Sequence, residues 1–442
     1  MSQRAAPWLA FAAFALGCGG EDQLPAPDRI QLVDVPAVPS RQLDLLLQID
    51  DSNSASEKAF LLEAALPALF ATLATVDGGL PDLHVGVISS DLGGSSTAHP
   101  ELASSTLVGC EGLGDDGLLQ VPVTVTSLHG GAYVVDEAGA GGVRTTNYDG
   151  SLADVVRQLM RLGDQGCGFE QPLGAIRRAL VPGHNAGFRR PEANLAVIIL
   201  ADEDDCSILD PALLEVSTDR FGALQSFRCT REGLVCDQPL DALGAKTNCR
   251  SNEDSAFVEP IALTHAALDA AAPSSAQVVL AAIVGDPTPV EVEPRTPPTG
   301  TAPIPALHHT CSYTEATGTE VADPAVRIAE LVDSFESRGL RGSACAPPYT
   351  DQVRAIATAI KSSLGTVCLP QALPTLDCEA HDTHADGSRS DIPACDASRT
   401  TDCFELVDDP VACAETPLHQ RFVVHRTAPT PTLTRVALTC AR

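Results

Sequence analysis

Two groups of oxygen-bearing side chains follow two of the most apolar runs of the 442-residue chain. The first group is Asp50, Ser52 and Ser54, which occupy alternating positions directly after the run LDLLLQI. The second is Asp202, in the acidic stretch that follows NLAVIIL. Carboxylate and hydroxyl oxygens are the ligands that the hard cations Mg²⁺, Mn²⁺ and Ca²⁺ prefer. If the two groups meet in the fold, the sequence predicts an all-oxygen site for a divalent cation.

The elements that would bring these groups together are buried strands that alternate with amphipathic helices. Near-continuous apolar runs are typical of strands buried on both faces of a parallel sheet. Helical spacing follows each of them in turn. The sequence therefore predicts an α/β fold with a doubly wound, mostly parallel sheet, and ligands bind such sheets at the carboxyl ends of the strands. The predicted strands are residues 43–49, 83–89, 194–200 and 276–285; the predicted helices are 56–74, 152–162, 172–180, 260–271, 324–339 and 350–365.

With these motifs in order, the sequence resembles the von Willebrand factor type A (VWA) domain, a Rossmann-type fold. In that family a strand runs into Asp-x-Ser-x-Ser, a middle loop supplies a Thr, and a later strand ends in Asp. These residues hold a divalent cation at the metal-ion-dependent adhesion site (MIDAS). Asp50, Ser52 and Ser54 match the first element and Asp202 matches the last. The middle loop lacks a Thr, and Asp164 is the nearest candidate ligand there.

The resemblance covers residues 41–365 and leaves three long insertions and a separate C-terminal segment. The segments GCGFEQPL and DEDDCS are similar to secreted, Cys-rich members of the family from bacteria such as myxobacteria. The last part of the chain, residues 366–442, is rich in cysteine and poor in apolar runs, so we expect a small module stapled by disulfides. The predicted insertions are residues 91–150, 205–256 and 286–323.

The N-terminus predicts export. Residues 1–17 combine a basic Arg4 with a short apolar run, which is the pattern of a signal peptide. The following Cys18 resembles the acylated cysteine of bacterial lipoproteins, and the absence of Asp after it favours the outer membrane. Residues 18–40 contain four prolines and are expected to form a flexible tether.

The cysteine count supports the same compartment. The chain has 15 cysteines and no Cys-x-x-Cys pair, which argues against structural zinc. If Cys18 carries a lipid, the remaining 14 can form seven disulfides, as expected outside the cytoplasm. A Cys167–Cys206 bond would pin the two proposed metal loops together, although spacing does not fix the connectivity.

The net charge limits the possible partners. With 28 basic and 58 acidic side chains the chain carries a formal charge of −30, so it repels nucleic acid and anionic lipid headgroups. Contact with a membrane is expected only through the lipid anchor.

Other polar residues have weaker interpretations. Glu170 and Gln171 could orient the metal loop, but Glu170 is better explained as an acid that favours the first turn of the next helix. His381 and His384 could bind a metal with Asp382, but they fall in a polar segment where histidines are usually only solvated.

The sequence as a whole predicts a non-enzymatic binding or adhesion lipoprotein that contacts an extracellular or periplasmic protein or glycan. A structural envelope lipoprotein with a degenerate, metal-free site is the alternative. A metal-dependent hydrolase is less favoured, because the common hydrolase motifs are absent. Ser52 also stands where a haloacid dehalogenase needs its second Asp.

Overall fold

The computed structural model describes residues 29–297, 301–315, 318–369, 377–397, 400–431 and 433–441. Cys18 and the predicted signal peptide lie outside these residues. Within the described part of the chain, no helix is long and apolar enough to cross a bilayer.

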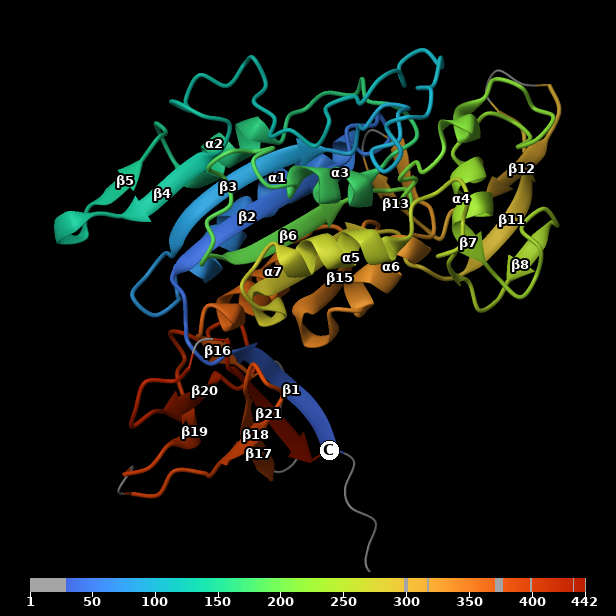
Figure 1. Cartoon of the computed structure of the whole chain (residues 1–442). Coiled ribbons are helices and arrows are strands. Elements are labelled where there is room, and N and C mark those ends of the chain that lie inside the picture. The colour runs from blue at the N-terminus through green and yellow to red at the C-terminus, as the bar shows by residue number, and fades with distance from the viewer. Residues whose placement is uncertain are drawn as a thin grey trace, which may run out of the picture.

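A seven-stranded sheet forms the centre of the larger body (Figure 1). Five of its strands pair in parallel, and the last two continue the sheet in antiparallel pairing. In spatial order the strands are β15 (Gly339–Ser343), β10 (Val278–Val284), β6 (Asn194–Leu200), β2 (Gln42–Ile49), β3 (Asp82–Ser89), β4 (Val134–Ala138) and β5 (Arg144–Thr146).

Helices cover both faces of this sheet because its strands are apolar on both sides. Along β2, Leu43, Leu45 and Leu47 pack with one group of helices, while Leu46 packs with the other. The first group is α1 (Ser56–Leu73), α2 (Leu152–Leu159) and α7 (Thr350–Ser363); the second is α3 (Pro172–Ala179), α5 (Ile261–Ala270) and α6 (Val326–Asp333). One expected core residue of α1, Phe60, instead lies on the surface with 60% of its area exposed.

The insertions fold into short antiparallel units beside the body. One joins β8 (Gly244–Lys246), β11 (Val290–Arg295) and β12 (Ile304–Leu307). The others are the pair β7 (Leu234–Val235) and β9 (Arg250–Ser251), and the hairpin of β13 (Cys311–Glu315) and β14 (Gly318–Ala322). The short helix α4 (Phe227–Gly233) precedes β7, and single 3₁₀ turns occur at Ala140–Gly142, Pro211–Leu214, Ser275–Gln277 and Glu336–Arg338.

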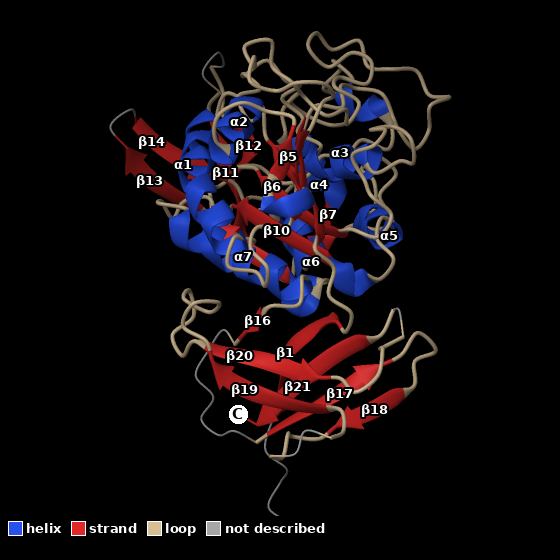
Figure 2. Ribbon diagram, turned by 90° about the vertical axis from the view of Figure 1, so that its left-hand side faces the viewer, coloured by secondary structure: helices blue, strands red, loops and turns tan. Residues whose placement is uncertain are grey.

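Both ends of the described chain meet in a second, smaller unit made of two antiparallel sheets (Figure 2). One sheet contains β1 (Arg29–Pro36), β21 (Arg435–Ala441), β17 (Cys378–Thr383) and β18 (Arg389–Ile392). The other contains β16 (Val367–Cys368), β20 (Gln420–His425) and β19 (Cys403–Asp408). Side chains of the two sheets form one apolar cluster, and we call this unit the terminal sandwich.

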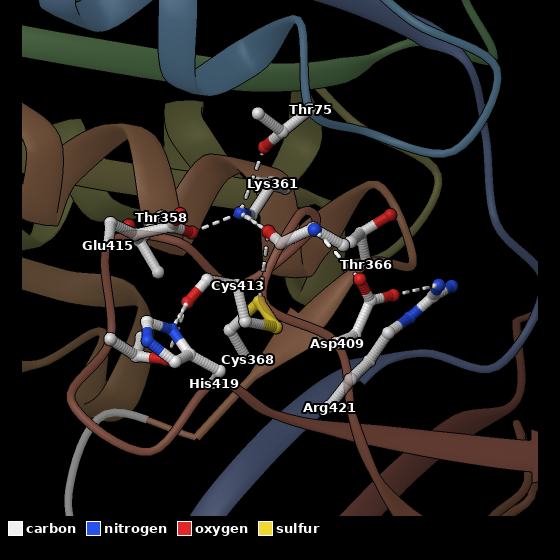
Figure 3. Close-up of a disulfide and its surroundings, with 12 residues drawn as sticks. Thr75, Thr358, Lys361, Thr366, Cys368, Asp409, Cys413, Glu415, His419 and Arg421 are labelled. Atoms are coloured by element: carbon white, nitrogen blue, oxygen red, sulfur yellow. Dashed lines mark hydrogen bonds and ion pairs between the residues drawn. A yellow bond between two sulfur atoms is a disulfide. The ribbon is translucent and has the colours of Figure 1, made fainter.

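The terminal sandwich is fixed to the body around Lys361 of α7 (Figure 3). The ammonium of this buried lysine contacts the Glu415 carboxylate and the Ala412 carbonyl, and it donates to Thr75 Oγ1 at 3.1 Å. A disulfide between Cys368 and Cys413 holds the loop that carries Glu415. This joint connects α1, α7 and the sandwich.

Seven disulfides are present among the described residues, as expected from the cysteine count. The suggested Cys167–Cys206 bond is wrong, because Cys167 pairs with Cys110 and Cys206 pairs with Cys229. The remaining bonds are Cys236–Cys249, Cys311–Cys345, Cys368–Cys413, Cys378–Cys440 and Cys395–Cys403. This disulfide content is typical of a protein outside the cytoplasm.

The predicted fold class, a doubly wound, mostly parallel α/β fold, is wrong for this molecule. Parallel pairing is confined to five strands of a mixed sheet, and the other five sheets of the described chain pair only in antiparallel fashion. The physical reason is that the insertions and both ends form short hairpins and a sandwich instead of extending the parallel sheet.

Two local expectations also fail at the ends of the chain. Residues 29–36 are strand β1 and not part of a flexible tether, because they pair with β21. The alternating segments QRFVVHR and LTRVALT predict a terminal hairpin, but the strands that they contain, β20 and β21, belong to different sheets.

Candidate functional site

The site lies at the carboxyl ends of the neighbouring strands β2 and β6. These strands pair in parallel with Ile49 beside Leu200, so the residues that follow them leave the sheet at the same edge. The backbone N–H of Asp50 donates to the Leu200 carbonyl at 3.0 Å. Asp50 and Asp202 are each only 3% exposed. The parallel register thus places both carboxylates together, as the strand pattern predicts.

The loop from Asp50 to Ser54 turns back on itself before α1 begins at Ser56. The Ser52 N–H donates to Asp50 Oδ1 at 2.8 Å, and the Ser52 and Ser54 hydroxyls lie 3.0 Å apart. The Ser54 hydroxyl donates to Asp202 Oδ1 at 3.4 Å. Four of the five predicted ligands therefore form one connected group.

Asp164, the fifth predicted ligand, lies at the rim of this site. It is exposed, and its carboxylate accepts a hydrogen bond from the side chain of the neighbouring Gln165. Asp164 and Asp50 line the same surface hollow of about 370 Å³. The structure places Asp164 near the group and records no contact between it and the other four residues.

Glu170 is the acid that the sequence interpretation undervalued. It lies in the loop before α3, outside the helix, and is 3% exposed. One of its oxygens, Oε2, accepts a hydrogen bond from Ser90, while Oε1 is buried without a partner. Asp50 Oδ2 is likewise buried without a partner. The site therefore contains two buried carboxylate oxygens that no protein donor satisfies.

The electrostatics of the site reflect the crowding of acids. Burial, followed by repulsion from Asp202, raises the pKa of Asp50 to about 7. Burial, followed by repulsion from Asp50, raises the pKa of Glu170 well above its usual range. Burial also raises the pKa of Asp202, although the ammonium of Lys58 opposes that shift. A nearby positive charge would favour the ionised form of all three.

Lys58, in the first turn of α1, is a cation already present at the site. Its ammonium lies 3.1 Å from Asp202 Oδ2 and 3.3 Å from Glu320 Oε2. It also donates to the Ser54 carbonyl at 3.0 Å, and its side chain is only 1% exposed. No sequence pattern indicates this contact, since a lysine on an amphipathic helix is ordinarily expected in solvent.

These residues fit a hard divalent cation. The ligand atoms that the proposed metal-binding residues offer are carboxylate and hydroxyl oxygens, which Mg²⁺, Mn²⁺ and Ca²⁺ prefer. A buried carboxylate oxygen without a hydrogen bond is costly unless a cation compensates it. Asp50 and Glu170 would hold such an ion directly or through water, with Ser52, Ser54 and Asp202 beside them.

The weaker histidine hypothesis gains no support. His384 hydrogen-bonds Ser390 at 3.1 Å, and Asp382 is paired with the Arg426 guanidinium. These residues belong to the terminal sandwich, where their polar groups bind other side chains of the protein.

Comparisons with known proteins leave the family of the chain open. No protein-family model matches it, and no curated protein matches its sequence. Among solved structures, the chain is similar to the pilus adhesin SpaC from Lactobacillus rhamnosus GG in its open conformation, with 9% sequence identity and a TM-score of 0.31. The match covers 93% of this chain and 40% of that one. A score this low does not establish a shared fold, so the VWA resemblance stays a prediction.

Proposed function

We propose that this chain is an exported binding protein that holds a divalent cation at Asp50, Ser52, Ser54 and Asp202, with Glu170 as a further ligand. The observation that carries the proposal is the unpartnered, buried Oδ2 of Asp50 in the middle of an all-oxygen group. An ion there would offset the repulsion among the neighbouring carboxylates.

The arrangement of these residues supports an adhesion-type role. Asp50, Ser52 and Ser54 follow one central strand and Asp202 follows its neighbour, which is the order of ligands in the VWA family that the sequence resembles. In this proposal the cation binds an oxygen of the partner, a protein or a glycan. The role is binding and not catalysis.

The compartment forms part of the proposal. The seven disulfides support an oxidising environment. A lipid on Cys18 would anchor the protein to the outer membrane, with the candidate site outside the cytoplasm.

A structural role with a metal-free site is the second candidate. It is favoured by Lys58, whose ammonium already compensates Asp202. In that case a chelator should leave every interaction of the protein unchanged.

Calorimetric titration of Mg²⁺, Mn²⁺ and Ca²⁺ into the purified, oxidised protein tests the first candidate. We expect saturable binding at one site that Asp50→Asn abolishes. Glu170→Gln should weaken it by at least about tenfold, because a carboxylate next to the ion contributes more than ~1.4 kcal/mol.

Asp164→Asn provides the matched control, since it removes an acid from the rim of the same hollow. It should leave the affinity nearly unchanged if Glu170 is the ligand. Absence of ion binding by the folded wild-type protein would contradict the proposal and leave the structural role.

A further inference from the structure

At one side of the candidate site, the Lys58 ammonium supplies the positive charge that a metal ion would otherwise supply. Asp202 uses both of its oxygens within the protein: Oδ2 faces Lys58 at 3.1 Å and Oδ1 accepts from Ser54. The lysine side chain is only 1% exposed, so little water screens these contacts. Asp202 is therefore electrostatically compensated from inside the fold.

Asp50 and Glu170 differ from Asp202 in this respect. Each keeps one buried oxygen, Asp50 Oδ2 and Glu170 Oε1, without a hydrogen bond. A divalent ion attracted to these oxygens would approach the carboxylate that Lys58 occupies. Two positive charges that compete for the same buried carboxylate repel each other strongly.

Glu320 offers the ammonium a second carboxylate. It lies on β14, in the hairpin of β13 and β14, 3.3 Å from the lysine nitrogen. Two bonds fix this hairpin near the site: the Cys311–Cys345 disulfide, and a hydrogen bond of 2.8 Å from the Asp323 N–H to the Asp202 carbonyl. The ammonium can thus move towards Glu320 without leaving a carboxylate partner.

We propose that Lys58 is a tethered competitor of the divalent cation, whose ammonium holds Asp202 and must shift towards Glu320 before an ion reaches that carboxylate. This inference rests on the proposed cation site. Its consequence is that Lys58 sets the ion concentration at which the site fills. Lys58 and Glu320 are positioning residues, because they act on the ion through Asp202.

The test is calorimetric titration of Mn²⁺ into the full protein and five variants, one of them a double variant. Lys58→Met should bind the ion at least about tenfold more tightly, because it removes a positive charge close to the ion. Lys58→Arg keeps the charge and should retain the weak affinity. Glu320→Gln alone should weaken ion binding, and it should have little effect when combined with Lys58→Met.

Lys361→Met is the matched control, since it removes another buried lysine from its carboxylate partner at the joint.

The outcomes separate this inference from the proposed function. If wild type and Lys58→Met bind Mn²⁺ equally, the competitor role is wrong and the cation site stands. If only Lys58→Met binds, the competitor role stands and a cation-dependent function of the wild type is wrong. If neither folded protein binds, both are wrong. Should Lys58→Met fail to fold, Lys58→Arg and Glu320→Gln decide the question, and unchanged affinity in Glu320→Gln would overturn the competitor role.

Discussion

At the scale of single residues, the site combines acids that need a cation with a lysine that supplies one. Asp50 and Glu170 each keep an unsatisfied buried oxygen, whereas Asp202 is paired with Lys58. Burial penalises unpaired charges. The negative charge of these acids is therefore neutralised by protons, by Lys58 or by a bound ion. The charge state of the site therefore affects the stability of the whole body.

Part of this site could be predicted from the sequence. Asp50, Ser52 and Ser54 follow one apolar run and Asp202 follows another, so neighbouring parallel strands suffice to bring them together. Glu170 could not be assigned, because its position depends on the path of a loop with no periodic pattern. Its only signal is that an acid lies two positions before Pro172, where α3 begins.

Folding stability should decrease as the pH rises from 5 to 7.5 in the presence of a chelator. Burial raises the pKa of Asp50 to about 7, and that of Asp51 and of Asp204 to about 6, from a usual 3.8. Across this window the folded state keeps protons that the unfolded chain releases, so the free energy of unfolding falls with pH. Each pKa unit is worth about 1.4 kcal/mol, and the total loss should reach about 2 kcal/mol or more. Urea unfolding at several pH values measures it.

The variant Asp50→Asn serves as the control for this pH dependence. It removes the carboxyl group with the highest of the three pKa values. The decrease in the free energy of unfolding with pH should therefore become smaller. A stability that stays constant or increases over the same pH range would show that these acids are not protonated in the folded protein.

At the scale of elements, the loop between α2 and α3 approaches the site closely enough to require glycine. A Cβ on Gly166 would lie 2.6 Å from the carboxylate of Asp51, which itself accepts a hydrogen bond from Ser90 at 3.0 Å. The Cys110–Cys167 disulfide holds the adjacent residue of this loop. The loop that carries Glu170 is thus fixed from two directions.

Gly166→Ala should destabilise the protein by about 1–3 kcal/mol, as expected when an added methyl group forces packed neighbours apart. The displaced Asp51 carboxylate would also disturb Ser90 and, through it, Glu170. Urea unfolding measures the first effect, and Mn²⁺ titration measures the second as a weaker affinity.

Gly168→Ala is the matched control in the same loop, because a Cβ there meets no atom within 4 Å. It should leave both stability and affinity nearly unchanged. Equal effects of the two substitutions would mean that loop flexibility, and not the close approach to Asp51, explains the requirement for glycine.

At the scale of the whole molecule, the terminal sandwich unites the two ends of the described chain at a distance from the candidate site. β1 pairs with β21, and β2 then runs through the body away from the sandwich (Figure 1). Asp50 directly follows the last residue of β2, Ile49. The first described residue, Arg29, therefore belongs to the sandwich and not to the part of the body that carries the candidate site.

The sequence indicated the buried strands of the body but not this assembly. Apolar runs identify β2, β3, β6 and β10 because each strand is buried on both faces. The sandwich depends on pairing Arg29 with Ala441 across almost the whole chain, and no local pattern specifies that partner. The strands β7, β8, β9, β11 and β12 of the insertions are equally hard to predict, since each has only two to six residues.

The joint between body and sandwich should depend on the buried ion pair of Lys361 with Glu415. Neither side chain exceeds 9% exposure, so Lys361→Met leaves a buried carboxylate without its cation. Such a change typically costs about 3–5 kcal/mol. We expect a lower unfolding midpoint and, by small-angle X-ray scattering, a wider spread of orientations between the two units.

The exposed ion pair of Asp77 with Arg421 spans the same joint and gives the matched control. Asp77 is 63% exposed, and exposed pairs contribute only about 0–1 kcal/mol, so Asp77→Ala should change little. Replacing both buried partners, Lys361→Met with Glu415→Leu, should recover much of the lost stability, because no charge is then left uncompensated. If the double variant recovers stability but keeps the wider scattering distribution, the ion pair fixes the orientation of the sandwich more than it stabilises the fold. If Lys361→Met alone matches the wild type in both measurements, the Cys368–Cys413 disulfide and the surrounding packing suffice to hold the joint.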